Sequence, residues 1–299
     1  MKVAVTGGTG FLGRYIVNHL LEGGHACRCW YRPSSDRGGF VSSGGGIEWI
    51  EGRLGDGKSG EALVSGVDAV VHSALAWGGS AGRGLIDFAQ TNLMGSLQLM
   101  QAARDAKAGR FVFIATCAVH EKILDDRPLD EAHPLWPTGH YGAHKAAIEK
   151  FVHSFGLGEG WAICSLRPTG IYGPKRPLEA SRWYEMVQGV VRGEAVDSVR
   201  GGKEVHASDV ARAVGLLLEA DPGHITGEAF NCCDMYIADE TVAEIAREIS
   251  GSAAAIARRN HGPRHQIDTS KLRALGMTFG GEALLRETVR QLVEEKVDS

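Results

Sequence analysis

The sequence of 299 residues lacks any run of lysines and arginines, and its formal net charge is -4. Proteins that bind nucleic acid usually present a basic face, so we expect no nucleic-acid partner. No apolar stretch approaches the roughly 20 residues that a membrane-spanning helix needs, so we expect no membrane partner. Hydrophobic residues make up 43% and charged residues 23% of the chain, as in a globular protein with a substantial core.

Cysteine is also sparse, with six residues whose spacing matches neither a zinc ribbon nor a zinc finger. Most of them lie in apolar, strand-like runs, where a free thiol behaves as a small hydrophobic side chain. No signal peptide precedes the first strand-like run. His140 and His144 have a spacing compatible with a metal ion, but no third ligand is apparent. We therefore expect a cytoplasmic protein without a metal site.

Short β-branched runs alternate with longer amphipathic runs in the first two-thirds of the chain. The strands predicted there span residues 3–6, 26–31, 47–50, 67–72, 110–116 and 161–166. The helices predicted between them span residues 11–22, 85–107 and 141–155. This alternation favours a parallel sheet with crossover helices on both faces, which is the doubly wound, Rossmann-type α/β fold.

The alternation weakens after Arg167-Pro168, and a smaller lobe is predicted from residue 174 onward, partly interleaved with the main sheet. Its predicted helices span residues 181–192, 208–219 and 239–250, with a strand over 229–232. The segment 174–205 carries basic residues that could meet phosphates if they are not merely solvated, namely Arg176, Arg182, Arg192, Arg200 and Lys203.

A glycine-rich loop follows the first predicted strand directly, with the sequence Thr6-Gly7-Gly8-Thr9-Gly10-Phe11-Leu12-Gly13. Glycines permit a tight turn and leave backbone N–H groups open to a pyrophosphate, while the next helix adds the positive end of its dipole. The placement between a strand and a helix is the context that distinguishes a dinucleotide site from an ordinary glycine turn. The loop therefore predicts a bound dinucleotide.

The tip of the second predicted strand bears on which dinucleotide is bound. An acidic residue there would accept hydrogen bonds from the ribose of NAD, whereas a basic residue suits the 2′-phosphate of NADP. The tip reads Trp30-Tyr31-Arg32-Pro33-Ser34, without an acidic residue. Arg32 is either a ligand of a 2′-phosphate or a solvated arginine, and we expect NADP or NAD, with the balance toward NADP.

A tyrosine and a lysine four residues apart form the predicted catalytic pair. Tyr141 and Lys145 share one face of the predicted helix. A phenol has a pKa near 10, and a neighbouring ammonium group would lower that pKa and favour the phenolate, a general base. Thr116 closes the fifth predicted strand, at the edge where open α/β sheets bind ligands, and its hydroxyl could share the substrate proton.

The order of these motifs along the chain resembles the extended short-chain dehydrogenase/reductase family. The segments that carry the resemblance after the glycine loop are His72-Ser73-Ala74, Thr91-Asn92-Leu93-Met94-Gly95, Thr116, Tyr141 with Lys145, Arg167-Pro168-Thr169-Gly170-Ile171-Tyr172-Gly173-Pro174, His206-Ala207-Ser208-Asp209-Val210 and Gly227-Glu228-Ala229-Phe230-Asn231. They extend over about residues 1–232. The best-known members of this family are NAD-dependent epimerases and dehydratases that act on nucleotide sugars.

The resemblance implies roles for individual residues. Thr116, Tyr141 and Lys145 become the catalytic residues. Together with Arg32, the cofactor-binding residues are Gly7, Gly10, Phe11, Leu12, Gly13, Ala74, Asn92, Lys145 and Pro168. His120 and Tyr172 are candidates for contact with the substrate, although His120 could equally be a packed core histidine. Residues 1–173 become an NAD(P)-binding domain and residues 174–299 mainly a lobe that binds a small-molecule substrate. A homodimer through the helices 85–107 and 141–155 is a further expectation.

The chain departs from the family pattern at several places, among them His120 in place of a tyrosine, His144 in place of a serine or threonine, and two that bear directly on the chemistry. Family dehydratases carry an Asp-Glu pair after the catalytic hydroxyl, whereas this chain has Cys117 and Ala118, so we expect no water elimination. The usual Gly-Asp-Leu after the third strand is replaced by Gly52-Arg53-Leu54, with Asp56 two positions late, which puts the adenine contact in doubt.

Three functions are weighed on these residues. The first is an NAD(P)-dependent epimerase or dehydrogenase that acts on a sugar-like or nucleotide-sugar substrate. The second is an NADPH-dependent carbonyl reductase of the dihydroflavonol or steroid type, which Arg32 favours. The third, a non-catalytic redox sensor that binds NAD(P), is disfavoured because Tyr141 and Lys145 are both present.

Overall fold

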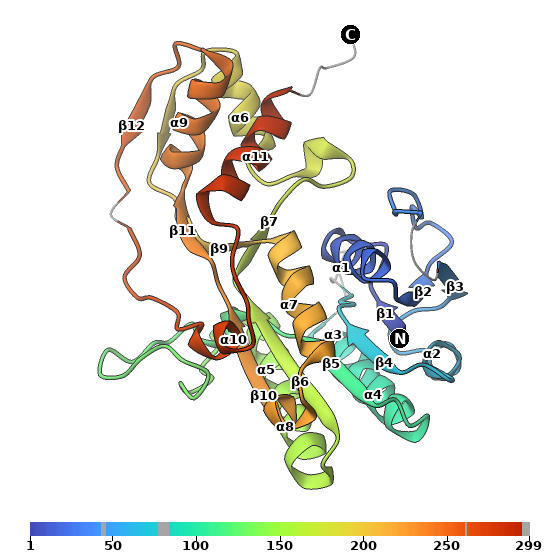
Figure 1. The fold of residues 1–299 in the computed structure, drawn as a ribbon. Helices are drawn as coiled ribbons and strands as arrows, with labels where there is room; N and C mark the ends of the chain where they lie inside the picture. Colours follow the sequence, from blue (N-terminus) through green and yellow to red (C-terminus); the bar gives the residue numbers. More distant parts are fainter. Residues whose placement is uncertain (43–45, 77–83, 261, 295–299) are drawn as a thin grey trace. The chain divides into compact units, whose positions relative to one another are not determined.

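The computed structural model describes residues 1–42, 46–76, 84–260 and 262–294 (Figure 1). The chain divides into two compact units. The first unit comprises Met1–Pro168, Val210–Cys232 and Ile267–Met277. The second comprises Thr169–Asp209, Cys233–Gln266 and Thr278–Ser299. Each unit is assembled from segments that are far apart in the sequence.

A seven-stranded sheet, parallel throughout, forms the centre of the first unit, with the strand order β10-β6-β5-β4-β1-β2-β3. The strands are β1 (Lys2–Thr6), β2 (Ala26–Tyr31), β3 (Ile47–Glu51), β4 (Ala69–His72), β5 (Arg110–Ile114), β6 (Ala162–Pro168) and β10 (Glu228–Cys232). The chain order reverses between β1 and β4, which opens a crevice at the carboxyl ends of these strands, where such sheets bind ligands. The predicted Rossmann-type fold is confirmed.

Helices cover both faces of this sheet (Figure 1). One face carries α1 (Phe11–Glu22) and α7 (Ala207–Glu219), where His19 of α1 lies against Gly215 of α7. The other carries α2 (Gly57–Val64), α4 (Gly95–Asp105) and α5 (His140–His153), which pack on one another. The buried apolar side chains between this second layer and the sheet include Trp30, Leu63, Leu99, Met100, Phe111, Phe113, Ile148, Trp161 and Ile163. Their burial fixes the sheet that positions the site.

The long helix predicted at residues 85–107 is built from three pieces. These are α3 (Leu85–Ala89), a π-helical turn (Gln90–Met94) and α4. A second π-helical turn (Ser154–Gly158) extends α5. π-helical turns are rare and occur often at functional sites, and the first of these carries Asn92.

The second unit has its own smaller sheets and core. A three-stranded sheet has the order β11-β9-β7, formed by β11 (Met235–Ala238), β9 (Gly201–His206) and β7 (Gly170–Tyr172). A two-stranded sheet joins β12 (Ile256–Arg258) to β8 (Val196–Ser198). The helices α6 (Tyr184–Val191), α9 (Asp239–Ser250) and α11 (Gly281–Glu294) pack around a common apolar core.

The remaining short helices are α8 (Pro222–Ile225), α10 (Ser270–Ala274) and the 3-10 turns Cys117–Val119 and Leu178–Ala180. None of the helices in the described ranges is long and apolar enough to cross a lipid bilayer.

Candidate active site

A hydrogen bond between two backbone groups closes the glycine loop between β1 and α1. The amide of Gly10 donates to the carbonyl oxygen of Gly7 at 2.9 Å, and Gly7 has a φ of +72°. A Cβ on Gly7 would lie 3.0 Å from the amide nitrogen of Ala74, and a Cβ on Gly13 would overlap the carbonyl oxygen of Gly7. The loop therefore requires glycine at both positions, because the backbone approaches itself too closely for a side chain.

The N-terminus of α1 has no side-chain cap. Its N-cap is Gly10, which has no side chain to cap the helix, and its first turn contains no acidic residue. The first amides of α1, beginning at Phe11 and Leu12, thus lie at the positive end of the helix dipole, next to the glycine loop. Such a set of donors fits the pyrophosphate of a dinucleotide.

A buried hydrogen-bond network joins this loop to the residues after β4. The Thr6 hydroxyl accepts from the amides of Ser73 and Ala74, both at 3.1 Å, and lies 2.7 Å from Nδ1 of His72. Nε2 of His72 lies 2.8 Å from the hydroxyl of Ser96 on α4. Burial lowers the pKa of His72 to about 3, so the ring is neutral and structural. The network fixes Ala74 against the glycine loop.

Asn92 holds the backbone of the next segment. Its side-chain oxygen accepts from the amide of Ala76 at 2.8 Å, and its amide group donates to the carbonyls of Ala76 at 3.0 Å and Phe88 at 3.2 Å. The side chain is 1% exposed. Asn92 therefore orders the chain beside the crevice, as a residue that shapes a cofactor site would.

The segment after β2 is folded back on α1 and presents Arg32 to solvent. Arg14 of α1 donates to the carboxylate of Asp36 at 3.1 Å, and the Thr9 hydroxyl lies 3.4 Å from that of Ser35. The backbone amide of Arg32 donates to Ser35 at 3.0 Å, while its exposed guanidinium has no partner among the residues that the structure describes. Arg32 is thus available for an anionic ligand.

The three predicted catalytic residues come together at the end of β5. Thr116 follows the strand, and its hydroxyl is hydrogen-bonded to that of Tyr141 on α5. Lys145, one turn further along α5, donates from Nζ to the carbonyl of Ile114 at 2.6 Å, and Nζ lies 4.5 Å from the ring centroid of Phe113. The phenol, the hydroxyl and the ammonium group therefore converge at the carboxyl end of one strand.

Burial acts on both titrating groups of this cluster. It raises the pKa of Tyr141, and the hydrogen bond from Thr116 offsets part of that effect. Burial also lowers the pKa of Lys145 to about 7, and the Glu149 carboxylate opposes that shift. The pKa of Tyr141 is thus governed by burial and by Thr116, while Nζ of Lys145 is bonded to the carbonyl of Ile114, and the lowering of the Tyr141 pKa by Lys145 stays a prediction.

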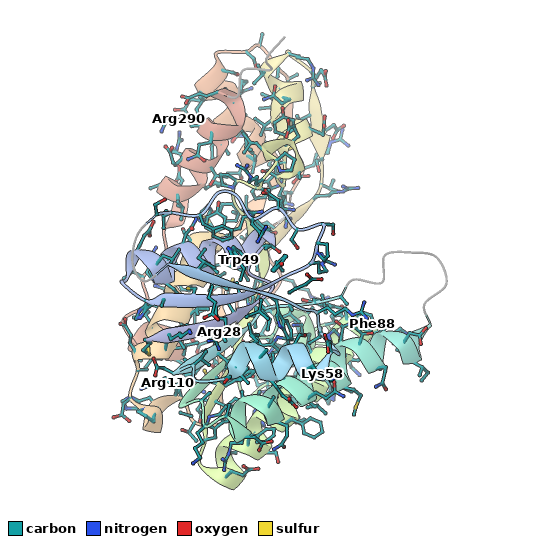
Figure 2. All side chains as sticks on the ribbon, turned by 90° about the vertical axis from the view of Figure 1, so that its right-hand side faces the viewer. Arg28, Trp49, Lys58, Phe88, Arg110 and Arg290 are labelled. Atoms are coloured by element: carbon teal, nitrogen blue, oxygen red, sulfur yellow. The ribbon has the colours of Figure 1, made fainter. Side chains whose placement is uncertain are left out.

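Aromatic rings enclose Tyr141 on the side of α3. The ring of His144 lies 5.7 Å from that of Tyr141 and 4.8 Å from that of Phe88. Figure 2 shows Phe88 on the opposite side of the first unit from Arg110, which begins β5, so these rings lie toward the carboxyl ends of the strands. Burial lowers the pKa of His144 to about 4, and the ring is neutral at the pH of the cell.

Both predicted substrate residues are buried, and the Tyr172 hydroxyl has no hydrogen-bond partner among the described residues. His120 is 4% exposed, and its Nε2 lies 3.2 Å from a guanidinium nitrogen of Arg167. Burial first, and Arg167 second, lower its pKa to about 4. Tyr172 belongs to the second unit, is fully buried and packs on the rings of Trp183 and His206. These contacts favour the interpretation of His120 as a packed core residue. Tyr172 is likewise a core residue of the second unit.

A buried ion pair next to this cluster was not anticipated from the sequence. Glu149 on α5 accepts from Arg167 on β6 at 2.7 to 3.1 Å through both carboxylate oxygens, and the side chains are 0% and 2% exposed. The only signal in the sequence is the spacing of Tyr141, Lys145 and Glu149, which places all three on one face of α5.

Cys117 and Ala118 occupy the positions of the missing acid–base pair. The Cys117 thiol donates to the carbonyl of Arg167 at 3.0 Å, and the amide of Ala118 donates to the Thr116 hydroxyl at 3.1 Å. Neither side chain can exchange a proton with a substrate as a carboxyl group would. The two positions after Thr116 thus carry no carboxyl group, and Tyr141 remains the predicted general base.

Replacing Thr116 with Val is expected to lower kcat by about 100-fold, within the range for a group that assists proton transfer. The valine keeps the branched shape but removes the hydroxyl that bonds Tyr141 and caps the turn at Ala118. Thr116→Ser is the matched control, since it retains the hydroxyl and should retain most of the activity. Steady-state rates measured with saturating cofactor compare Thr116→Val and Thr116→Ser with the native chain. Equal losses in both variants would mean that the hydroxyl has no role.

Comparison with known proteins agrees with this geometry. Residues 3–233 match the model of the NAD dependent epimerase/dehydratase family. The low-salt glycan biosynthesis protein Agl12 of Haloferax volcanii is 28% identical over 92% of this chain and 93% of its own length. A ketoreductase of Stigmatella aurantiaca, which acts on a 4-hydroxy-2-methyl-3-oxo-4-farnesyl-3,4-dihydroquinoline-1-oxide, is 30% identical over 78% of this chain and 68% of its own length.

The fold is also shared with solved structures. The UDP-glucose 4-epimerase of Thermus thermophilus, in complex with NAD, superposes with a TM-score of 0.76 at 25% identity and covers 99% of this chain and 100% of its own. The resemblance drawn from the motifs is thereby confirmed. The chain belongs to the NAD dependent epimerase/dehydratase family.

Proposed function

We propose that this protein is an NAD(P)-dependent epimerase or dehydrogenase that acts on a hydroxyl-bearing carbon of a sugar-like or nucleotide-sugar substrate. The observation that carries the proposal is the hydrogen bond between the hydroxyls of Tyr141 and Thr116, with Lys145 one turn away on the same helix. Relatives whose names refer to glycan biosynthesis and to a UDP-glucose 4-epimerase support the substrate class.

Each residue has a definable task in this reaction. Tyr141 takes the proton of the substrate hydroxyl, and Thr116 shares that proton and orients the substrate oxygen. The ammonium group of Lys145 stabilises the phenolate, since a charge of opposite sign favours the ionised form. The bound dinucleotide, held at the glycine loop and the N-terminus of α1, supplies the acceptor and donor of hydride. With Cys117 and Ala118 after Thr116, the chain is suited to hydride exchange rather than to elimination of water.

A groove within the second unit is the proposed place for a bound substrate in that unit. An open groove of about 680 Å³ is lined by residues that include Arg182, Trp183, Arg200, Tyr236 and Asp239. The Arg182 guanidinium lies over the ring of Trp183 at 4.9 Å and pairs with the buried Glu204 at 2.7 Å. The groove combines these two arginines with the carboxylates of Glu185 and Asp239 and with aromatic rings, so it suits a polar substrate, which supports the second unit as a substrate-binding lobe.

The test is an assay of the purified protein with NAD and a panel of UDP- and dTDP-hexoses. A product that differs from its substrate only in the configuration of one carbon, formed without net change of cofactor, supports an epimerase. Failure to convert any hydroxyl- or carbonyl-bearing substrate, with cofactor bound, would overturn the proposal.

A carbonyl reductase is the second candidate, because the exposed and unpartnered Arg32 suits NADP and because one relative is a ketoreductase. If Arg32 binds the 2′-phosphate, Arg32→Ala should weaken NADP binding by about 10-fold to 100-fold, the expected loss of a charge-assisted pair, and leave NAD binding unchanged. Calorimetric titration of both cofactors measures this. Arg290→Ala, which removes an exposed arginine from α11 of the second unit, serves as the comparison. Equal affinities for NADP before and after the Arg32 change would remove the basis for NADP.

We also propose a homodimer through the helical surface of α3, α4 and α5. This surface carries exposed apolar side chains, which in a monomer would be left in water. They are Leu85, Ile86, Met94, Phe151 and Leu157. Sedimentation equilibrium should give twice the chain mass, and Ile86→Glu should dissociate the dimer. A monomer at micromolar concentration would contradict this proposal.

The proposed location is the cytoplasm, which the six free thiols support because a reducing compartment keeps them unpaired. Cell fractionation tests this, and recovery from outside the cytoplasm would refute it.

A further inference from the structure

The environment of Lys145 raises a question that the catalytic residues alone do not answer. Its side chain is 4% exposed, and its Nζ contacts a carbonyl oxygen and the face of the Phe113 ring. These neighbours carry no full negative charge. A buried ammonium group needs such a charge to remain protonated, because desolvation disfavours the charged form.

Glu149 is a buried carboxylate one helical turn from Lys145 on α5. It lies one turn further along α5, so that Tyr141, Lys145 and Glu149 follow one another on the same face of the helix. The carboxylate is fully buried and is the opposing influence on the lowered pKa of Lys145, which is about 7. Both its oxygens are fixed by the guanidinium of Arg167.

Arg167 is in turn immobilised on β6. Its third nitrogen lies 3.2 Å from Nε2 of His120 and donates to the carbonyl of Glu131 at 3.2 Å. Every nitrogen of the guanidinium is therefore engaged, and the bidentate pair fixes the carboxylate at one position. A carboxylate held in this way cannot rotate, so its negative charge stays at one position relative to Lys145.

We propose that Glu149 is a positioning residue of the active site: its carboxylate, clamped by Arg167, keeps Lys145 protonated so that Lys145 can stabilise the Tyr141 phenolate. The catalytic part of this inference rests on the proposed function. The electrostatic part is a property of the ligand-free protein and can be measured without turnover.

The other titratable groups around Lys145 do not take this role. His72 at the end of β4 has its pKa lowered to about 3, and His144 beside Lys145 has its pKa lowered to about 4. Both are neutral or, if charged, would repel the ammonium group. Tyr141 is neutral in the ligand-free state because burial raises its pKa. Within the described part of the chain, Glu149 is thus the negatively charged group that raises the pKa of Lys145 against the effect of burial.

The experiment is an NMR titration of isotopically labelled, ligand-free protein, which follows the lysine Cε and Nζ resonances as the pH is raised. The resonance of Lys145 is identified as the one that disappears in Lys145→Arg. Glu149→Gln keeps the size of the side chain and removes its charge. The titration midpoint of Lys145 should fall by about one pH unit or more, the effect typical of losing a nearby opposite charge. In the pH profile of kcat, the alkaline limb should move to lower pH, because the active form needs the protonated lysine.

Two further variants separate electrostatics from folding. Glu149→Gln alone leaves Arg167 buried without its counter-ion, which can unfold the protein, so Glu149→Gln/Arg167→Met is measured beside it. The double variant removes both charges of the ion pair, so the Lys145 midpoint should still fall, but by less than in Glu149→Gln alone, because the nearby positive charge of Arg167 is removed as well. Glu159→Gln removes a carboxylate from the exposed pair with Arg104 near the end of the same helical segment and should change nothing.

The outcomes are distinct. A lowered midpoint in both Glu149 variants, with Glu159→Gln unchanged, supports the proposal. An unchanged Lys145 midpoint in a folded Glu149 variant overturns it, whatever the activity. If the midpoint falls but Tyr141→Phe is fully active, the electrostatic role of Glu149 stands and the proposed function is what fails.

Discussion

Replacing Tyr141 with Phe is expected to lower kcat by about 1,000-fold while the dissociation constant of the cofactor stays unchanged. The magnitude is that of losing a positioned general base. The phenylalanine ring can keep its packing against His144, at 5.7 Å in the native chain, so the fold should not change. Steady-state kinetics and calorimetric titration of the cofactor measure the two quantities separately.

A second phenol provides the control for this prediction. Tyr15 of α1 packs edge-on against Phe11 at 5.6 Å, outside the cluster at the end of β5. Tyr15→Phe removes one hydroxyl in the same way and should retain activity. If Tyr141→Phe and Tyr15→Phe were equally active, Tyr141 could not be the base.

Replacing Gly13 with Ala is expected to abolish the glycine loop as a binding site. The added methyl group would overlap the carbonyl oxygen of Gly7 and crowd Gly8, so that the loop and the start of α1 must separate. Overpacking of this kind costs about 1–3 kcal/mol, and the affinity for the dinucleotide should fall by at least about 10-fold because its backbone donors are displaced. Thermal unfolding and cofactor titration report the two effects.

Gly57→Ala is the matched control for the change at Gly13. A Cβ at Gly57, the first residue of α2, would meet nothing within 4 Å. Alanine in a helix is up to about 1 kcal/mol more favourable than glycine, so this variant should be at least as stable as the native chain. Unaltered cofactor affinity in Gly13→Ala would show that the loop does not bind the dinucleotide.

The helices with clear local signals were predicted accurately from the sequence. The bounds expected for α1 and α9 agree with those observed, because an amphipathic repeat in each case ends at a glycine or just before one. The strand predicted at residues 110–116 ends instead at Ile114, where the ladder with β6 stops. Thr116 is still extended but begins a 3-10 turn, which the apolar run of the sequence does not reveal.

The strands of the second unit could not be predicted in the same way. β7, β8 and β12 have three residues each, too few for an alternating pattern to be recognised. Their partners lie far away in the sequence, since β7 pairs with β9 and β8 with β12. Only the tertiary fold brings these segments together.

The active-site cluster could be predicted because its members are close in sequence or mark a strand end. Tyr141 and Lys145 share a helix face, and Thr116 ends a strand next to it. The pairing of Glu149 with Arg167 depends on how α5 packs on β6, which local patterns do not encode. For the same reason the sequence could not decide between a substrate contact and a core position for His120, because its neighbour Arg167 is apparent only in the folded structure.

The most direct test of the central claim is a rapid-mixing experiment with the protein saturated with NAD and a substrate that it converts. The absorbance of reduced nicotinamide should appear during a single turnover in the native chain. It should be absent in Tyr141→Phe, which still holds the cofactor. Turnover of substrate at the native rate without any transfer of hydrogen from the reacting carbon to nicotinamide would contradict the account.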